Sequence, residues 1–418
     1  MSERARNVLL LGVDYGLFLV GLAFASQATI LPAFAAWLGA PNVVIGAIPA
    51  VMTLGWFLPS LFAAGHTEAL PRQWPFIMRW TGWERVPYLV IAVFAFFVAD
   101  QAPALTLAVL LAMLLLSTGV GGLLMPSWMD LIGRAVPTAT RGRFFALASL
   151  AAGLVGFAAS FVVADVLARV PAPASYGICF LAASVCLALS WIALAFVREP
   201  EGRATREPVA LGVYLARVPG LLRRDRNLSW FLAARAFAIA GMMSGGFYTV
   251  YALGAWAAPP SQAGVFTALL VAGHAIGTLT LGWVADHAGH RLVLLTGATA
   301  TVAANVVALL AGSLGGFEAV FVLVGVQTAA VNVSGLNVLL EFAPAADERP
   351  TYIGLGSTLM APVAFATPLL GGLMADALGF RAVFVTALAA GLGGLVMLAS
   401  LVHDPRRLIA RPTGEVTA

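Results

Sequence analysis

The chain has 418 residues, of which 61% are hydrophobic and only 10% are charged. Soluble globular domains carry roughly 25% charged residues, and disordered chains need low hydrophobicity with high net charge, so both classes are excluded. The formal net charge of +4 is small and forms no basic stripe of the kind that nucleic acid requires. The composition therefore indicates an integral membrane protein.

Long apolar runs without strand-like alternation predict membrane-spanning helices, because lipid offers no partner to exposed backbone groups and one span takes about 20 apolar residues. The amino-terminal run is too long for the core of a signal peptide, so we expect it to remain as the first span. Twelve spans are predicted in two sets of six. The first set lies at 8–36, 43–64, 86–99, 104–128, 144–167 and 176–197, and the second at 228–254, 263–285, 292–312, 317–340, 351–375 and 381–402.

A polar, Arg-rich stretch separates the two sets and predicts a cytoplasmic linker. The predicted domains are an N-terminal bundle at 1–197, the linker at 198–227, a C-terminal bundle at 228–402 and a cytoplasmic tail at 403–418. With the amino end inside, every Arg lies on the inner side except three, namely Arg169, Arg235 and Arg381. The positive-inside rule therefore predicts a multi-pass protein of a bacterial inner membrane with both termini in the cytoplasm.

The two halves match each other at a near-constant offset. Arg141-Gly-Arg-Phe144 corresponds to Arg349-Pro-Thr-Tyr352, and Ala36-Trp37 corresponds to Ala255-Trp256. Same-direction repeats of six spans are typical of transporters with a site between two bundles. Because Arg141 and Arg349 occupy the loops that enter the fifth span of each half, we predict that both take part in gating.

The sharpest motif is Gly282-Trp-Val-Ala-Asp286-His-Ala-Gly289-His-Arg291, between the eighth and ninth predicted spans. It resembles the loop signature G-x-x-x-D-x-x-G-x-[RK] of the major facilitator superfamily, and the span count and duplication resemble that family over the whole chain. The resemblance implies an all-α fold of twelve transmembrane helices in two pseudo-symmetric six-helix bundles, and a gating role for these four residues. Physically, Gly permits a tight turn, and Asp can accept hydrogen bonds from a neighbouring helix N-terminus or from an Arg. An ordinary Gly-rich turn with solvated charges is the alternative interpretation.

The first-half copy of this loop departs from the signature, because Glu68 stands in the position of Asp286. We expect Glu68 to pair with Arg141 or Arg143 as a substitute latch, and a solvated loop remains the alternative. The polar loop is predicted to continue past Glu68 through four more charged residues, Arg72, Arg79, Glu84 and Arg85.

Asp14 and Arg235 are ionisable residues inside predicted spans, at near-equivalent places in the first and seventh. Each lies about two turns, roughly 10 Å, from the cytoplasmic boundary. Such groups cost a few kcal/mol or more in lipid and mark function by default. An Asp14–Arg235 pair, an anionic substrate held by Arg235 and a proton carried by Asp14 all remain open, as does snorkelling of either side chain to the interface.

Other polar residues of the second half are candidates for the substrate or proton site. Gln327 and Asn332 lie deep in the tenth span and are predicted to line a cavity, although polar stripes also join helices to each other. Glu341, near the loop, is predicted to be a gate or a cap. His274 is a lone histidine that either shuttles a proton or packs as a hydrogen-bonded core residue. Two aromatic residues, Tyr248 and Tyr251, are predicted to form part of an amphipathic pocket.

No motif supports catalysis or a cofactor. The chain has no nucleophile elbow, no HExxH and no phosphate-binding loop with its Lys, and metal-ligand spacing is absent around His274. We predict a monomeric, non-enzymatic secondary transporter that moves a small organic solute by alternating access, with proton coupling and with the lipid bilayer as its environment. Export of drugs or other amphipathic compounds is one alternative, and a transport-inactive membrane scaffold or sensor is another.

Overall fold

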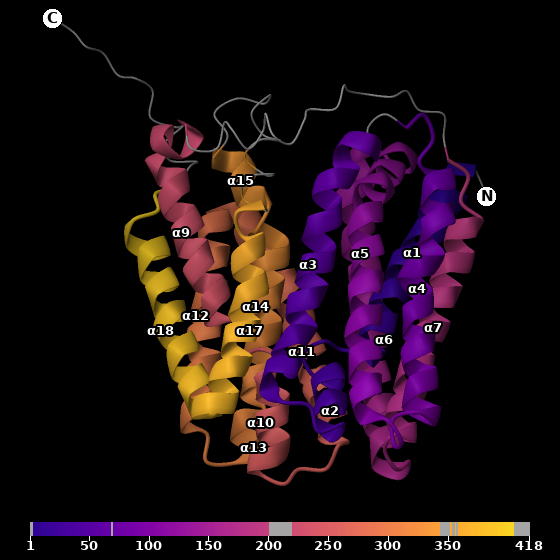
Figure 1. The fold of residues 1–418 in the computed structure, drawn as a ribbon. Helices are drawn as coiled ribbons and strands as arrows, with labels where there is room; N and C mark the ends of the chain where they lie inside the picture. Colours follow the sequence, from indigo (N-terminus) through magenta and orange to yellow (C-terminus); the bar gives the residue numbers. More distant parts are fainter. Residues whose placement is uncertain are drawn as a thin grey trace, which may run out of the picture.

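A computed structural model describes residues 3–67, 70–199, 220–342, 352, 356 and 358–404, and these residues form helices and connecting turns without a strand (Figure 1). In the first half the helices are α1 (Glu3–Phe24), α2 (Ile30–Trp37), α3 (Asn42–Thr67), α4 (Trp74–Phe97), α5 (Pro103–Ala135), α6 (Thr138–Arg169) and α7 (Ala174–Ala195). In the second half they are α9 (Arg226–Gly241), α10 (Phe247–Ala255), α11 (Gln262–Ala288), α12 (His290–Leu310), α13 (Leu314–Phe317), α14 (Ala319–Ser334), α15 (Asn337–Phe342), α17 (Ala361–Leu378) and α18 (Phe380–Ser400).

The described helices make twelve passes, as the sequence predicts. Ten stretches are long and apolar enough to cross a membrane by length and composition. The third pass is α4, a 24-residue helix interrupted by three charged residues, and the seventh is divided between α9 and α10. The all-α architecture of two six-pass bundles is therefore confirmed.

The first and seventh passes are broken at equivalent places. α1 stops at Phe24 and α2 resumes at Ile30, while α9 stops at Gly241 and α10 resumes at Phe247. The predicted spans 8–36 and 228–254 are thus each two helices rather than one. Freed backbone groups at such breaks need internal partners, because lipid supplies none. In the second half Asn305 provides one, since its Nδ2 donates to the Gly241 carbonyl over 3.1 Å.

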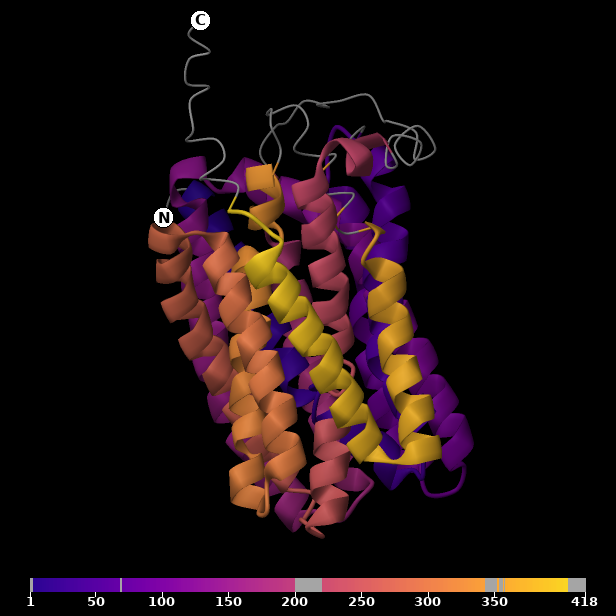
Figure 2. The same cartoon turned by 90° about the vertical axis from the view of Figure 1, so that its left-hand side faces the viewer.

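The two bundles stand side by side and approach each other at one end. We call the end where α1 begins and α18 stops the terminal end, and its opposite the far end (Figures 1 and 2). Across the bundles α3 packs on α17 and α6 packs on α11. Near the far end the hydroxyls of Thr29 and Thr267 are 2.6 Å apart, and Thr249 donates to the Ala28 carbonyl over 2.8 Å.

The buried apolar clusters follow the same division. One cluster runs from the first bundle into the second at the far end, through Met243, Phe247 and Ala263. At the terminal end the first bundle has a cluster around Leu11 of its own, and the second bundle has another around Phe231. The bundles therefore share a core at the far end and keep separate cores at the terminal end.

Candidate functional site

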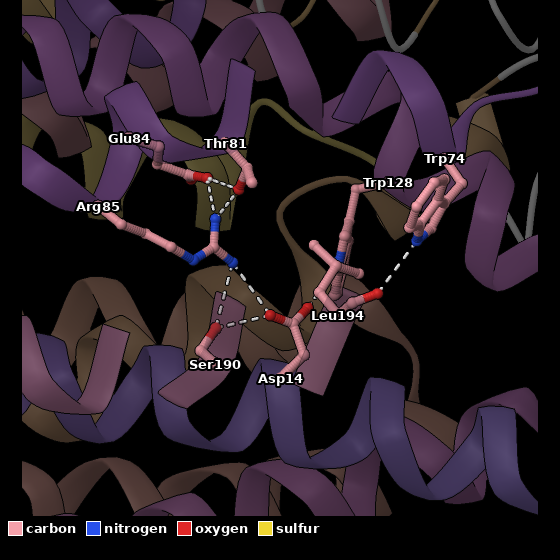
Figure 3. Close-up of polar contacts among 8 residues, drawn as sticks. All are labelled: Asp14, Trp74, Thr81, Glu84, Arg85, Trp128, Ser190 and Leu194. Carbon is pink, nitrogen blue, oxygen red and sulfur yellow. Dashed lines mark hydrogen bonds and ion pairs between the residues drawn. The ribbon is translucent and has the colours of Figure 1, made fainter. Parts of the chain in front are cut away.

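A buried charge cluster occupies the middle of the first bundle (Figure 3). Arg85 on α4 contacts Asp14 on α1 with 3.0 Å between Nη2 and Oδ1, and contacts its neighbour Glu84 with 2.8 Å between Nη1 and Oε2. The exposed fractions of Asp14, Glu84 and Arg85 are only 2%, 8% and 5%. Two carboxylates and one guanidinium thus share one site that solvent hardly reaches.

Neutral side chains from α4 itself and from two further helices, α5 and α7, complete the cluster. Ser190 of α7 donates to Asp14 Oδ1 over 2.6 Å and accepts from Arg85 Nη2 over 3.1 Å. Trp128 of α5 donates its indole N–H to Asp14 Oδ2 over 3.0 Å. Thr81, one turn before Arg85 on α4, accepts from Arg85 and donates to Glu84 Oε2. The network fixes the relative positions of α1, α4, α5 and α7.

The position of the cluster corrects the sequence analysis. The third span was predicted at 86–99, with Glu84 and Arg85 in a polar loop, whereas α4 begins at Trp74 and places Arg85 about 16 Å further along the helix. Glu199 explains the early start, because its carboxylate accepts from the Gln73 and Trp74 backbone N–H groups over 2.8 and 2.9 Å. The aromatic and apolar residues between Trp74 and Trp83 were the signal available in the sequence for a longer span.

Asp14 and Arg235 are not brought together. Arg235 of α9 donates from Nη1 to the Gly335 carbonyl over 3.0 Å, where α14 ends. It borders a cavity of about 70 Å³ inside the second bundle. Gln327 lines the same cavity and donates to the sulfur of Met242 over 2.9 Å. Most of the other residues that line this cavity are apolar. Among the described residues Arg235 has one carbonyl partner and no carboxylate partner.

The remaining predicted substrate-site residues fall into separate groups. His274 and Asn332 meet over 3.1 Å between α11 and α14. Tyr248 is buried and hydrogen-bonded with Ser244 and Asn305 over 2.8 and 3.0 Å beside the break in the seventh pass. Tyr251 packs in an aromatic cluster with Trp256, Phe317, Phe380 and Phe384. Tyr248 contacts Phe317 and Phe384 of the same cluster.

The signature loop joins α11 to α12 at the terminal end. Gly289 has φ 95°, a conformation that L side chains rarely adopt. Arg291 Nη2 donates to the carbonyls of Leu398 and Ala399 over 3.1 and 2.7 Å, at the last turn of α18. Asp286 is exposed, and the described residues offer it no hydrogen bond or ion pair. In this conformation Arg291 stabilises a helix end, and Asp286 has no partner within the described part of the chain.

Of the other predicted gating residues, the structure describes Arg141 and Glu341, whereas Glu68 and Arg349 lie outside the described residues. Arg141 donates to the carbonyls of Gly133 and Val136 over 2.9 and 3.4 Å, at the end of α5. Glu341 lies 3.9 Å from His290 between side-chain oxygen and nitrogen. Within the described part of the chain no group of three or more His, Cys, Asp or Glu residues is arranged to hold a metal ion.

Comparison with known sequences identifies relatives among membrane exporters. The sequence model of the Major Facilitator Superfamily matches residues 236–417. The drug efflux pump JefA of Mycobacterium tuberculosis is 31% identical over 147 residues, and the match covers 34% of this chain and 28% of that protein. The tetracenomycin C resistance and export protein of Streptomyces glaucescens is 29% identical over 133 residues, which is 32% of this chain and 24% of that protein. The chain therefore spans only about a quarter of each relative's length.

Solved structures match over almost the whole chain. A bacterial homologue of the iron transporter ferroportin in an inward-facing state superposes with a TM-score of 0.71 at 15% identity, covering 96% of this chain and 99% of that one. The nucleoside transporter NupG superposes with a TM-score of 0.70 at 12% identity, covering 95% and 100%. At these identities the likeness concerns the fold alone. The second half of the chain is thus similar to the Major Facilitator Superfamily by sequence, and the whole chain is similar in fold to solved membrane transporters.

Proposed function

We propose that the protein is a secondary active transporter that moves a small organic solute across a bacterial inner membrane by alternating access, coupled to protons. The contacts between the bundles support this proposal, because the bundles share a core at the far end and have separate cores at the terminal end. A second packing that closes the terminal end and opens the far end presents the same central site to the other side of the membrane. With the terminal end in the cytoplasm, the present conformation faces inward.

The charge cluster of the first bundle is the observation that carries proton coupling. With all three groups ionised, Asp14, Glu84 and Arg85 have a net charge of −1 in a site that is almost fully buried. An uncompensated charge there is costly, and one bound proton removes it. Two tyrosines lie beside the cluster: Tyr88, one turn along α4 and within electrostatic range of Glu84, and Tyr15, which follows Asp14 and contacts Trp128. Asp14 is the proposed carrier, because its protonation weakens the ionic contact that ties α1 to α4.

The cluster has a structural route to the bundle interface. Trp128, which donates to Asp14, packs against Tyr15 with ring centroids 5.6 Å apart and against Phe145 of α6 at 6.3 Å. The helix α6 in turn packs on α11 of the second bundle. A movement of Asp14 can therefore shift Trp128, then Phe145 and α6, and so alter the contact between α6 and α11.

Flux measurements in proteoliposomes test the function. A thermal-shift screen of metabolites and amphipathic drugs first identifies a ligand, since a compound that binds only the folded protein raises its melting temperature. Flux of that compound, radiolabelled, is then measured with and without a pH gradient. Asp14→Asn is expected to abolish gradient-driven accumulation while sparing exchange. Asp165→Asn, in an exposed pair with Arg169, is the matched control. Unchanged driven accumulation in Asp14→Asn refutes the carrier role, and the absence of saturable flux for every stabilising ligand supports the scaffold or sensor alternative.

We further propose that Arg235 binds the anionic part of the solute. A half-buried guanidinium with one carbonyl partner among the described residues, beside a mostly apolar cavity, suits the carboxylate of an amphipathic molecule. Decanoate, decanol and decylamine share one chain and differ in charge. We expect only decanoate to raise the melting temperature of the wild type, and Arg235→Gln to remove that rise. Equal effects of the three compounds contradict the anion site.

Export of amphipathic compounds is the second candidate, and the names of the two partial relatives favour it. Everted and right-side-out vesicles distinguish the directions. Gradient-driven accumulation in everted vesicles supports export, whereas accumulation in right-side-out vesicles supports uptake.

A further inference from the structure

The signature G-x-x-x-D-x-x-G-x-R occurs a second time, at the far end of the molecule. Gly372-Leu-Met-Ala-Asp376-Ala-Leu-Gly379-Phe-Arg381 joins α17 to α18 with the same spacing as Gly282 to Arg291 between α11 and α12. Gly379 has φ 82° and ψ 167°, close to the φ 95° and ψ 158° of Gly289. Because three passes separate the two junctions, they face opposite ends of the molecule, and Figure 2 shows the α17–α18 junction away from both termini.

Asp376 of this second copy joins the two bundles. Its Oδ1 accepts from the backbone N–H of Asn42 over 2.8 Å and from Asn42 Nδ2 over 2.9 Å, and its Oδ2 accepts from the Val43 N–H over 2.9 Å. Asn42 and Val43 begin α3, so these N–H groups lack partners within their own helix. A carboxylate at a helix N-terminus is favoured both by hydrogen bonding and by the helix dipole.

Glycines bring the two helices close enough for this contact. A β-carbon at Gly372 would lie 2.5 Å from the Asn42 carbonyl oxygen, and one at Gly46 would collide with the Pro368 carbonyl oxygen. Gly372 and Asp376 are one turn apart on the same face of α17, as Asn42 and Gly46 are on α3. The close backbone contact between α17 and α3 therefore lies one turn away from the hydrogen bonds of the Asp376 carboxylate.

We propose that Asp376 is the far-end gating residue of the transport cycle, a carboxylate latch that holds α17 on α3 whenever that end is closed. At the terminal end the described residues give Asp286 no hydrogen bond or ion pair, and none of their atoms lies within 4 Å of a β-carbon built at Gly282. Asp376 therefore has partners in the other bundle while Asp286 has none among the described residues, as two gates that open alternately require. The inference rests on the proposed alternating access, and it assigns the far-end gate to this contact.

Distance measurements between spin labels test the latch without any transport assay. Ala104→Cys at the start of α5 and Gly312→Cys after α12 place labels at exposed far-end positions on different bundles, in a background with Cys179→Ala and Cys186→Ala. Double electron–electron resonance then reports the open and closed populations of that end. We expect Asp376→Ala to raise the open-to-closed ratio about five- to thirtyfold, the range for loss of a helix-capping side chain. Asp376→Asn, which keeps one acceptor oxygen, should give a smaller rise.

Two controls separate the latch from general destabilisation. Asp165→Asn removes another exposed far-end carboxylate whose partner is in its own helix, and it should leave the distances unchanged. Asn42→Asp opposes Asp376 with a like charge and should open the far end, whereas the double variant N42D/D376N exchanges the two side chains and should restore much of the closed population. Unchanged distances in both Asp376→Ala and Asn42→Asp overturn the proposal. Because no substrate enters the measurement, failure of the latch and failure of proton-coupled transport are distinguishable.

Discussion

The charge cluster predicts that three substitutions in one network have unequal effects. Arg85 is the sole cation and contacts both Asp14 and Glu84. Arg85→Gln leaves two buried carboxylates without a counterion, supported only by neutral donors such as Ser190, Trp128 and Thr81. Removing one partner of a buried ion pair typically costs about 3–5 kcal/mol, and we expect a loss of unfolding free energy of that size.

The neighbouring substitutions should cost less. Asp14→Asn leaves the Arg85–Glu84 pair neutral, and its amide oxygen still accepts from Ser190 or Trp128. Glu84→Gln leaves a neutral Arg85–Asp14 pair. Each change removes one charge-assisted contact, for which about 1.5–3 kcal/mol is typical. Replacing a whole buried ionic group by uncharged residues often changes the free energy of unfolding little. The triple variant D14N/E84Q/R85Q should therefore regain most of the stability that Arg85→Gln loses.

Denaturant unfolding of detergent-solubilised protein at several pH values measures these differences. In Arg85→Gln the carboxylates become neutral only by binding protons, so the loss of stability should be greatest at high pH and should shrink as the pH falls. The triple variant should show little of this pH dependence. If it proves at least as unstable as Arg85→Gln at every pH, the cluster is held by packing and not by charge balance, and the reasoning is refuted.

Two further substitutions test local features. Gly289→Ala forces a side chain into a positive-φ conformation and should cost about 1–2 kcal/mol, measured by the same unfolding assay, whereas Gly282→Ala enters open space and should change stability little. Asn305→Ala removes the bonds to the Gly241 carbonyl and to Tyr248 beside the break in the seventh pass. We expect a loss of about 2–4 kcal/mol and faster hydrogen exchange at 242–246, and unchanged exchange there would contradict a supporting role for Asn305.

Much of the fold was predictable because its signals are local. Span length, the Arg distribution and the duplicated segments require only composition and spacing, and they predicted twelve passes correctly. The charge cluster depends on contacts between residues far apart in the chain, such as Asp14 and Ser190, which no spacing rule connects. Adjacent charges at Glu84 and Arg85 favoured a loop, because a charged pair inside a span is rare unless other helices supply partners.

The far-end signature, in contrast, was readable and was missed. Its spacing from Gly372 to Arg381 is identical to that of the loop at Gly282. What the sequence alone could not supply is the partner of Asp376, since Asn42 lies in the other half of the chain. Spacing identifies a turn that can present a carboxylate, and only the packing of α17 on α3 determines which N–H groups donate to that carboxylate.

The buried Arg85 of the first bundle and the half-buried Arg235 of the second have very different partners, and this difference suggests a division of roles. Arg85 has carboxylate and hydroxyl partners on several helices, so its environment favours an internal proton over an incoming anion. Arg235 has one carbonyl partner and borders a cavity, so an anion can reach it without displacing a carboxylate. We therefore propose that protons bind in the first bundle and solute in the second. In this proposal, coupling between them passes through the α6–α11 contact, the same interface that rocking of the bundles must rearrange.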